Sequence, residues 1–424
     1  MSEPNSPRQY SRKLSPIERL WIVADTLYPP FVSQLVLEGE GGFDLPAWQQ
    51  AAKRASAANP GSRLVLRRFL GWSRWVDSEV PIEVHLIDGG DWDGKGPENA
   101  PFLKRPLPAR SGPTCEILLL QGNPNRVVLR AHHGVTDGIG GLGLIDDLFR
   151  ELRGKASRGT EGSQVDIDIV RQLGTKKIKV VKNNCQSPLP PATKDKPGTG
   201  TTWRRITIPG RHSNLLGKIA FAIAQRAHEL KRQTLAMTGD IDADQSNARV
   251  VRLDIAADMR HHSPESSASS ANLTGMITIE VSETDTVANI ISAMAAQRRA
   301  KREGMLVAAL GPLRWVPLRL LKQYWHYRTR RAYKSGCFAT SASLSNIGLL
   351  PVARYRGGGF KAKTAFAVPP GNAGIPLLII FNDTGQQVEL VAMVPDSAAS
   401  VQQLESLLED IKNTLLKDST GIKN

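Results

Sequence analysis

The amino-acid sequence predicts a mixed α/β protein of two domains, and three observations support this. The 424 residues exceed the ~100–200 of a typical domain. Helix-like and strand-like periodicities alternate along the chain. Hydrophobic residues make up 41% and charged residues 22%, which is ordinary globular usage and enough to bury a sizeable core.

Two helices are predicted near the start of the chain. Ser15-Pro16-Ile17-Glu18 is a capping box with proline at the first helical position, and an apolar face follows until Pro29-Pro30. A second helix is expected from about Asp44 to Asn59-Pro60. Residues 79–87 alternate in polarity and predict a strand.

A β-hairpin is predicted next, because apolar runs at 114–121 and 126–132 flank a Gly-Asn-Pro-Asn turn. Its second strand leads directly into HHGVTDG, residues 132–138. A glycine-rich elbow and a helix ending at Gly154 follow. Residues 155–203 are rich in Lys, Gly, Pro, Ser and Thr, and we interpret them as an exposed crossover between two halves.

The second half repeats mixed helix and strand patterns. Helices are predicted from Ser213 to about Arg232, from Thr284 or Thr286 to Gly304, at about 317–333 and at about 398–417. Strands are predicted at 248–256, 274–282, 338–344, 376–381 and 387–394.

Charge and cysteine usage narrow the class of partner and the setting. The formal net charge is +15, which favours a partner with negative charge. Between Arg298 and Lys334, eleven basic residues and one acid give a local net charge of +10. Cys115, Cys185 and Cys337 are far apart and fit neither a disulfide framework nor a zinc site. With no signal peptide or long apolar span evident, we expect a cytoplasmic protein.

The HHGVTDG sequence is the strongest candidate for a chemical site. Neutral imidazole suits general-base work because its unperturbed pKa is near 6.5. A histidine at a strand end, followed by a tight turn, is aimed in one direction. Asp137 is placed to brace that turn, and Gly138 with the following glycines allows chain and substrate to approach closely.

HHGVTDG resembles the HHxxxDG signature of the chloramphenicol acetyltransferase-like superfamily, which includes condensation domains, wax-ester synthases and polyketide-associated acyltransferases. The resemblance implies that His133 is the catalytic base. It also implies that His132 and Gly138 support the base and that Asp137 is structural and paired with an arginine. The fold that it implies is two acetyltransferase-like subdomains, 1–180 and 181–424, each a mixed sheet with helices. An active-site tunnel would run between them.

Other segments resemble the same superfamily more loosely. Residues 14–18 resemble its amino-terminal opening, and Asn59-Pro60 with Leu64 and Arg67 resembles an early strand entry in which the family has histidine. LDIAADMR at 253–260, with Asn272 and Gly275, resembles a "DLR…N…G" stretch and makes Arg260 the candidate partner of Asp137. LSNIG at 344–348 resembles a late "SNxG" motif, which implies that Ser345 and Asn346 line the tunnel or polarise the thioester carbonyl.

Two alternative sites and one branch of the superfamily are disfavoured. His261-His262 is followed by Ser266 and Ser267 at the positions where the motif requires Asp and Gly. No GxSxG elbow is evident, which argues against a serine hydrolase. The DFGWG motif of the plant branch is absent.

The resemblance implies acyl transfer from coenzyme A or a carrier protein to a hydroxyl or amine of a lipidic or natural-product acceptor, with no metal and no bound cofactor. Two alternatives stay open. One is a free-standing condensation enzyme that forms an amide from carrier-bound acyl groups. The other is a non-catalytic relative that binds acyl chains or a carrier protein.

Within the basic segment at about 312–334, the helix at about 317–333 is predicted to be amphipathic and to carry aromatic residues. Leu318, Leu321 and Trp325 share one side, and basic residues such as Arg319 and Lys322 share another. Three interpretations stay open: a packed helix with a solvated face, contact with an anionic membrane, and binding of a carrier protein or nucleotide. Nucleic acid is not expected, because no recognised module accompanies the charge.

Overall fold

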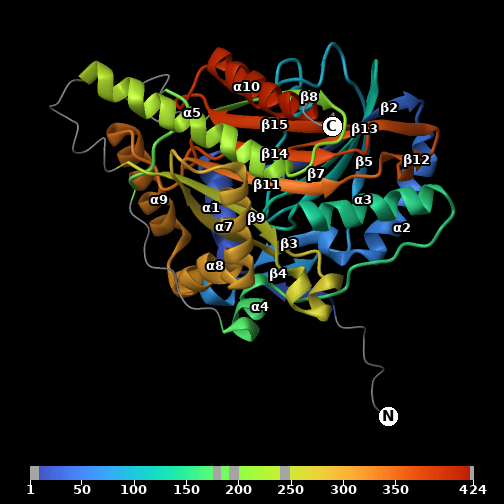
Figure 1. Ribbon diagram of the computed structural model, residues 1–424. Coiled ribbons are helices and arrows are strands. Elements are labelled where there is room, and N and C mark those ends of the chain that lie inside the picture. The colour runs from blue at the N-terminus through green and yellow to red at the C-terminus, as the bar shows by residue number, and fades with distance from the viewer. Residues whose placement is uncertain (1–8, 175–182, 191–199, 239–248, 421–424) are drawn as a thin grey trace.

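The computed structural model describes residues 9–174, 183–190, 200–238 and 249–420, and its framework is two six-stranded sheets (Figure 1). The N-terminal sheet contains β2 (Val32–Gly41), β5 (Glu83–Asp88), β6 (Cys115–Gln121), β7 (Asn125–His132), β12 (Arg356–Gly357) and β13 (Phe360–Val368). The C-terminal sheet contains β8 (Thr201–Pro209), β9 (Val251–Asp258), β10 (Thr274–Val281), β11 (Ala342–Leu349), β14 (Leu378–Asp383) and β15 (Gln387–Pro395). A small third sheet contains β1 (Ser11–Lys13), β3 (Leu64–Arg67) and β4 (Arg74–Asp77).

Both large sheets are mixed. The N-terminal sheet has the order β12-β13-β2-β7-β6-β5, antiparallel except for β5 with β6. The C-terminal sheet has the order β10-β9-β11-β14-β15-β8, in which β11 runs parallel to both of its neighbours. The predicted mixed α/β fold is therefore confirmed.

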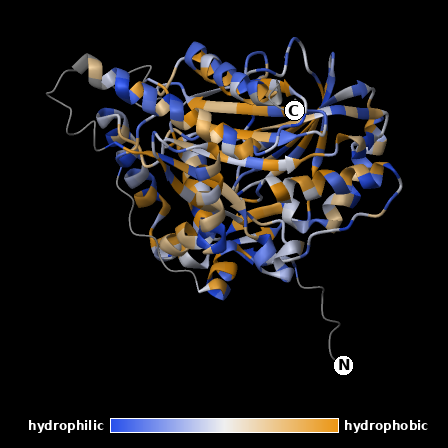
Figure 2. Cartoon of the chain, in the orientation of Figure 1, coloured by the Kyte–Doolittle hydropathy of each residue, from blue (hydrophilic) through white to orange (hydrophobic). Residues whose placement is uncertain are grey.

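Helices cover the two large sheets, and a hydrophobic core lies between each of these sheets and its helices. The helices are α1 (Pro16–Leu27), α2 (Leu45–Ala58), α3 (Gly138–Leu152), α4 (Asp166–Leu173), α5 (Leu215–Thr238), α7 (Val287–Arg299), α8 (Met305–Leu310), α9 (Leu318–Ser335) and α10 (Val401–Thr420). α2 and α3 pack on the N-terminal sheet, whereas α5, α7 and α10 pack on the C-terminal sheet. Figure 2 shows hydrophobic residues concentrated on the central strands, while the outer helices carry both hydrophobic and hydrophilic residues.

A third core lies between the two sheets and holds them together. It combines Val36, Leu118 and Val128 of the N-terminal sheet with Trp203 and Val391 of the C-terminal sheet. All five side chains are buried. The halves therefore meet through an apolar interface at one end.

The chain crosses between the halves late in the sequence. β13 lies after residue 181, yet it pairs with β2 in the N-terminal sheet, with Phe366 opposite Val36. The predicted division at residue 180 lies outside the described residues. The chain after it does not stay within one sheet, because residues 356–368 complete the first one.

Local signals predicted several elements well. The Ser15 hydroxyl accepts the Glu18 N–H at 3.2 Å, and a Glu18 carboxylate oxygen accepts the Ser15 N–H at 3.0 Å. This is the predicted capping box at the start of α1. The hairpin of β6 and β7 is also confirmed.

Other boundaries were wrong or missed. The stretch 155–203 is not wholly an exposed crossover, because it contains α4, whose Ile169 and Val170 are buried. The helix expected to reach Gly304 ends at Arg299, and Lys301 then adopts a left-handed backbone with φ of 51° that interrupts the helix. β2 and β13 were not predicted. None of the helices in the described ranges combines the length and hydropathy needed to span a membrane.

Candidate active site

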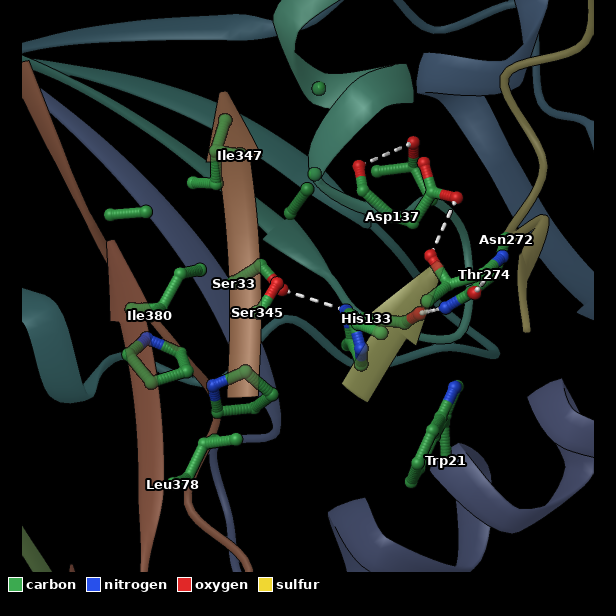
Figure 3. Close-up of a pocket in the computed structure, with 18 of the residues that line it drawn as sticks. Trp21, Ser33, His133, Asp137, Asn272, Thr274, Ser345, Ile347, Leu378 and Ile380 are labelled. Atoms are coloured by element: carbon green, nitrogen blue, oxygen red, sulfur yellow. Dashed lines mark hydrogen bonds between the residues drawn. The ribbon is translucent and has the colours of Figure 1, made fainter. Parts of the chain in front are cut away.

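A mostly apolar cavity of about 200 Å³ lies between the two sheets, and His133 is in its wall (Figure 3). His133 follows directly after β7. Because side chains alternate along a strand, Leu129, Ala131 and His133 face the cavity, whereas His132 points the other way and is fully buried. The strand end thus assigns the two histidines to different environments.

The imidazole of His133 is held in a defined orientation. Its Nδ1 lies 2.7 Å from Ser33 Oγ on β2, and its ring is flanked by Trp21 and Phe31, with centroids 5.4 and 5.8 Å away. Because the Ser33 hydroxyl occupies Nδ1, Nε2 is the ring nitrogen that remains available to a substrate. The Asn272 side-chain amide donates to the His133 carbonyl at 3.1 Å and fixes the backbone at the same point.

Burial controls the protonation of His133. Desolvation lowers the pKa of the imidazole to about 4, and the nearby Asp137 carboxylate opposes that shift only in part. The ring is therefore neutral near pH 7. A neutral imidazole facing an apolar cavity can accept a proton from an alcohol or amine.

His132 stabilises the turn at Gly134 from the side opposite the cavity. Its Nδ1 accepts the Gly134 N–H at 3.0 Å, so the ring proton lies on Nε2, which is 3.6 Å from Asp25 Oδ2. That separation is an electrostatic contact rather than a hydrogen bond. Burial raises the pKa of Asp25, but His132 and the Phe31 N–H outweigh it, and the net pKa is lowered.

Asp137 is the N-cap of α3 and joins the two halves. Its Oδ1 accepts the Gly140 N–H at 2.9 Å, and its Oδ2 accepts the Leu273 N–H at 2.9 Å and the Thr274 hydroxyl at 3.1 Å. Burial raises the pKa of Asp137, but Arg260 and these donors outweigh it and keep the pKa below its ordinary value. Asp137 is therefore a fully hydrogen-bonded carboxylate.

Arg260 makes the bidentate contact with Asp137 that the sequence predicted. Its two terminal nitrogens each lie 3.0 Å from an Asp137 oxygen. The same guanidinium donates to the carbonyls of Ser269 and Ala271 and to Asp258. Because Asp137 comes from the first half and Arg260 from the second, this pair fixes the motif against the opposite wall of the cavity.

Gly138 is the first residue of α3 and lines the cavity. A Cβ atom built at this position would meet nothing within 4 Å, so it would extend into open space. That glycine here lets a substrate approach the backbone closely stays a prediction.

The LSNIG segment forms β11, and only one of its two candidate residues faces the cavity. Ser343, Ser345 and Ile347 line the cavity at alternate positions of the strand. Asn346 is exposed, and its side-chain oxygen accepts the Gly348 N–H at 2.9 Å. Adjacent residues of a strand face opposite sides, so Ser345 and Asn346 cannot both line the tunnel. The expectation for Asn346 was therefore wrong.

The second histidine pair lies away from the cavity. His261 and His262 form the end of a 3₁₀ turn, Arg260–His262, and their rings are 3.9 Å apart. Their nitrogens and a carboxylate oxygen of Glu303 lie within 4.8 Å of one another. These three residues are the group in the described chain with a spacing that could hold a metal ion, and none lines the cavity.

Sequence reasoning missed Ser33, Trp21, Asp25 and Thr274. Ser33 was missed because β2 was not recognised. The signal was a short apolar run between Pro30 and Gly41-Gly42, which is the pattern of a buried strand. Thr274 and Asp25 are brought to the motif only by the tertiary fold.

Comparison with known proteins identifies the fold. No protein-family model matches the sequence, and no curated protein matches it. Among solved structures, the condensation domain from monacolin K polyketide synthase aligns with a TM-score of 0.61 and 12% identity, over 97% of each chain. The chain has the condensation-domain fold.

Two further structures agree with this assignment. A mutant starter condensation domain of rhizomide synthetase, in complex with C8-CoA and Leu-SNAC, aligns with a TM-score of 0.62 and 12% identity over 96% of this chain and 94% of that chain. The epimerization domain from the third module of tyrocidine synthetase B aligns with a TM-score of 0.57 and 14% identity over 98% of each. The predicted fold class, with two mixed sheets covered by helices, is therefore confirmed.

Proposed function

We propose that this protein is an acyltransferase that moves an acyl group from a thioester to a hydroxyl or amine, with His133 as general base. The observation that carries the proposal is the neutral imidazole in an apolar cavity between the halves, with Nδ1 engaged by Ser33. The condensation-domain fold supports it, as does the C8-CoA bound in one structurally similar protein.

The proposed reaction follows from that geometry. His133 Nε2 takes the proton from the acceptor hydroxyl or amine while the acceptor attacks the thioester carbonyl. The tetrahedral intermediate then collapses, the carbon–sulfur bond breaks, and the imidazolium returns the proton to the departing thiolate. Ester or amide and free thiol are the products, and His133 is neutral again.

Access from two sides would suit such a reaction. A second cavity of about 340 Å³ shares Gln34, Val368, Pro369 and Pro370 with the wall of the first. We propose that donor and acceptor approach His133 from different faces, one of them through this neighbouring cavity. The donor is coenzyme A or a carrier protein used as co-substrate, and the acceptor is lipidic or a natural product.

Amide formation between carrier-bound groups remains the second candidate. It is supported because the structurally similar proteins include the nonribosomal peptide synthetase FmoA3 and the first condensation domain of the CDA synthetase. The test is a panel of acyl-coenzyme A donors, offered with alcohols, amines and aminoacyl thioester analogues, with thiol release and product mass measured. His133→Ala is the control. Thiol release that needs His133 supports transfer, and binding without any His133-dependent product would support a non-catalytic relative.

We further propose that Ser345 polarises the thioester carbonyl. Its hydroxyl lines the cavity, whereas its neighbour Asn346 is exposed. Loss of one oxyanion donor costs ~10²–10³-fold in kcat. Ser345→Ala should lower kcat towards that range, and Asn346→Ala is the matched control that should not. Equal kcat values for Ser345→Ala and wild type would reject this role.

The setting that we propose is cytoplasmic, with peripheral contact to an anionic membrane involving the segment at about 312–334. The three cysteines are free, and Cys115 and Cys185 are buried, which suits a reducing compartment. The membrane contact rests on the surface described next.

A further inference from the structure

Three large aromatic side chains form a cluster on the surface. Phe69, Trp72 and Trp315 are 64%, 56% and 47% exposed. Trp72 lies 6.0 Å from Phe69 and 5.1 Å from Trp315, between ring centroids. We call these three residues the aromatic cluster. Exposed rings in mutual contact form a continuous apolar patch, which marks an interaction site far more often than scattered residues do.

The backbone holds this cluster in a strained conformation. Arg68 and Leu70 have φ values of 60° and 50°, a left-handed region that non-glycine residues rarely adopt. Arg19 of α1 is buried beneath and donates to the carbonyls of Leu70 at 3.1 Å and Val316 at 2.6 Å. One guanidinium thus ties together the two segments that carry the rings. Strain kept in this way is characteristic of functional surfaces.

A basic groove of about 650 Å³ adjoins the cluster and includes Trp72 and Trp315 in its lining. Five of its lining residues are cationic, and none of those lining it in the described chain is acidic: Lys13, Arg68, Arg74, Arg171 and Arg314. Arg314 lies over the Trp315 ring at 5.2 Å. The groove therefore has the charge to attract an anionic partner.

α9 begins three residues after Trp315 and carries further exposed apolar side chains. Leu320, Tyr324 and Tyr327 are 54%, 57% and 59% exposed and recur at the i, i+4, i+7 spacing of one helix face. We call these residues the α9 stripe. The predicted apolar face, with Leu318, Leu321 and Trp325, packs on the core beside α1. α9 therefore presents a second apolar stripe outward, among exposed Arg319, Lys322, Arg330 and Arg331.

The aromatic cluster and the α9 stripe hold six of the ten exposed large hydrophobic side chains in the described ranges. We propose that the aromatic cluster, the basic groove and the α9 stripe together form a docking surface for an anionic lipid bilayer. Tryptophan and tyrosine favour the headgroup level, and arginine and lysine bind anionic headgroups. A bilayer can cover both the apolar and the cationic parts at once.

The surface lies beside the candidate active site. Pro16 of α1 and Ala308 of α8 line the basic groove, whereas Ile17 and Val307, their neighbours in sequence, line the catalytic cavity. Docking would therefore bring the cavity close to lipid. The supply of a lipidic acceptor rests on the proposed function, but the docking itself does not.

The experiment is flotation of the full-length protein with vesicles of phosphatidylcholine, with and without phosphatidylglycerol, at low and high salt. Wild type should bind the anionic vesicles and lose affinity as salt rises. Each Arg near an anionic surface contributes ~1 kcal/mol, so replacing Arg68, Arg74 and Arg314 with Gln should weaken binding by roughly 100-fold at low salt. Arg211, Arg354 and Arg356→Gln is the control, which removes equal charge at exposed positions outside the groove.

A second set of variants tests the aromatic cluster. Phe69, Trp72 and Trp315→Ser should weaken vesicle binding, whereas the exposed residues Val80, Leu86 and Leu349→Ser should not. The proposal is overturned if wild type does not bind anionic vesicles. It is also overturned if the arginine variant and the aromatic-cluster variant each bind them as tightly as their control variants do. A selective rise in the KM for acyl-coenzyme A in the arginine variant, without vesicle binding by wild type, would assign the groove to the donor instead.

Failure of docking and failure of catalysis are distinguishable. His133→Ala should bind vesicles as wild type does, because the docking surface does not include the base. The arginine and aromatic-cluster variants should keep wild-type kcat on a water-soluble donor and acceptor, because none of the substituted residues lines the catalytic cavity.

Discussion

Two histidine pairs in this chain have the same sequence and opposite environments. His132 ends a central strand and His133 follows it, so the His132 ring is buried in the interior and the His133 ring faces a cavity. His261 and His262 end a 3₁₀ turn, and their rings lie against each other near the surface. The dipeptide alone therefore carries no function. Two features separate the pairs. The first continues β7 directly and is followed by Asp-Gly, whereas Met259 and a 3₁₀ turn place the second beyond the end of β9.

The largest expected effect is on turnover. His133→Ala should lower kcat by the roughly 10²–10⁴-fold typical of general-base loss. His262→Ala should leave kcat within about threefold of wild type, because His262 does not line the cavity. Steady-state kinetics at saturating donor, with circular dichroism to verify folding, makes the comparison. Similar losses in both variants would remove the distinction between the pairs.

The next effect concerns stability. Breaking a buried pair by removing one partner costs ~3–5 kcal/mol, so Asp137→Ala and Arg260→Ala should each unfold at lower denaturant concentration than wild type. Because the partners are in direct contact, the double variant should lose less than the sum of the two. Urea unfolding of all four proteins measures this coupling. Strict additivity would contradict the pairing.

A third prediction uses pH. Because burial lowers the pKa of His133 to about 4, the base stays neutral across the range in which an ordinary histidine gains its proton, near 6.5. The kcat/KM should therefore be level down to about pH 5 and fall as pH approaches 4. An acid limb near pH 6.5 in kcat/KM would show that His133 is not desolvated in the free enzyme.

The same shift affects stability in a defined direction. Between pH 6.5 and 4 the unfolded chain binds a proton at His133 that the folded chain does not. Stability should therefore decline as pH falls through that window, and His133→Gln should reduce the decline.

The smallest expected effect is that of metal removal. The His261, His262 and Glu303 group lies away from the cavity, and the proposed proton transfers use His133 alone. Dialysis against a chelator should change turnover by less than about twofold. A large loss that added Zn²⁺ restores would connect the second histidine pair to catalysis.

The sequence predicted those parts of the fold and site that local signals encode. The Ser15 capping box, the hairpin and the placement of His133 at a strand end all depend on residues close together in the chain. The pairing of Arg260 with Asp137 came from family resemblance, and the structure shows it. Ser33, Asp25 and Thr274 could not be predicted, because strand pairing and helix packing alone bring them to the motif. Asn346 was misplaced because the strand was expected to end at residue 344, whereas β11 extends to Leu349 and turns Ser345 and Asn346 to opposite faces.

The exchange of β13 into the N-terminal sheet has a practical consequence for dissecting the protein. A fragment ending near residue 180 would leave the outer edge of β2 without its partner, and its unpaired N–H and C=O groups would be a template for aggregation. The remaining fragment would carry β13 with no sheet of its own to join. Cutting the chain near residue 180 would therefore destabilise both halves. Two designs would keep β13 paired with β2. One attaches a second copy of residues 356–368 to the first half, and the other co-expresses the two fragments.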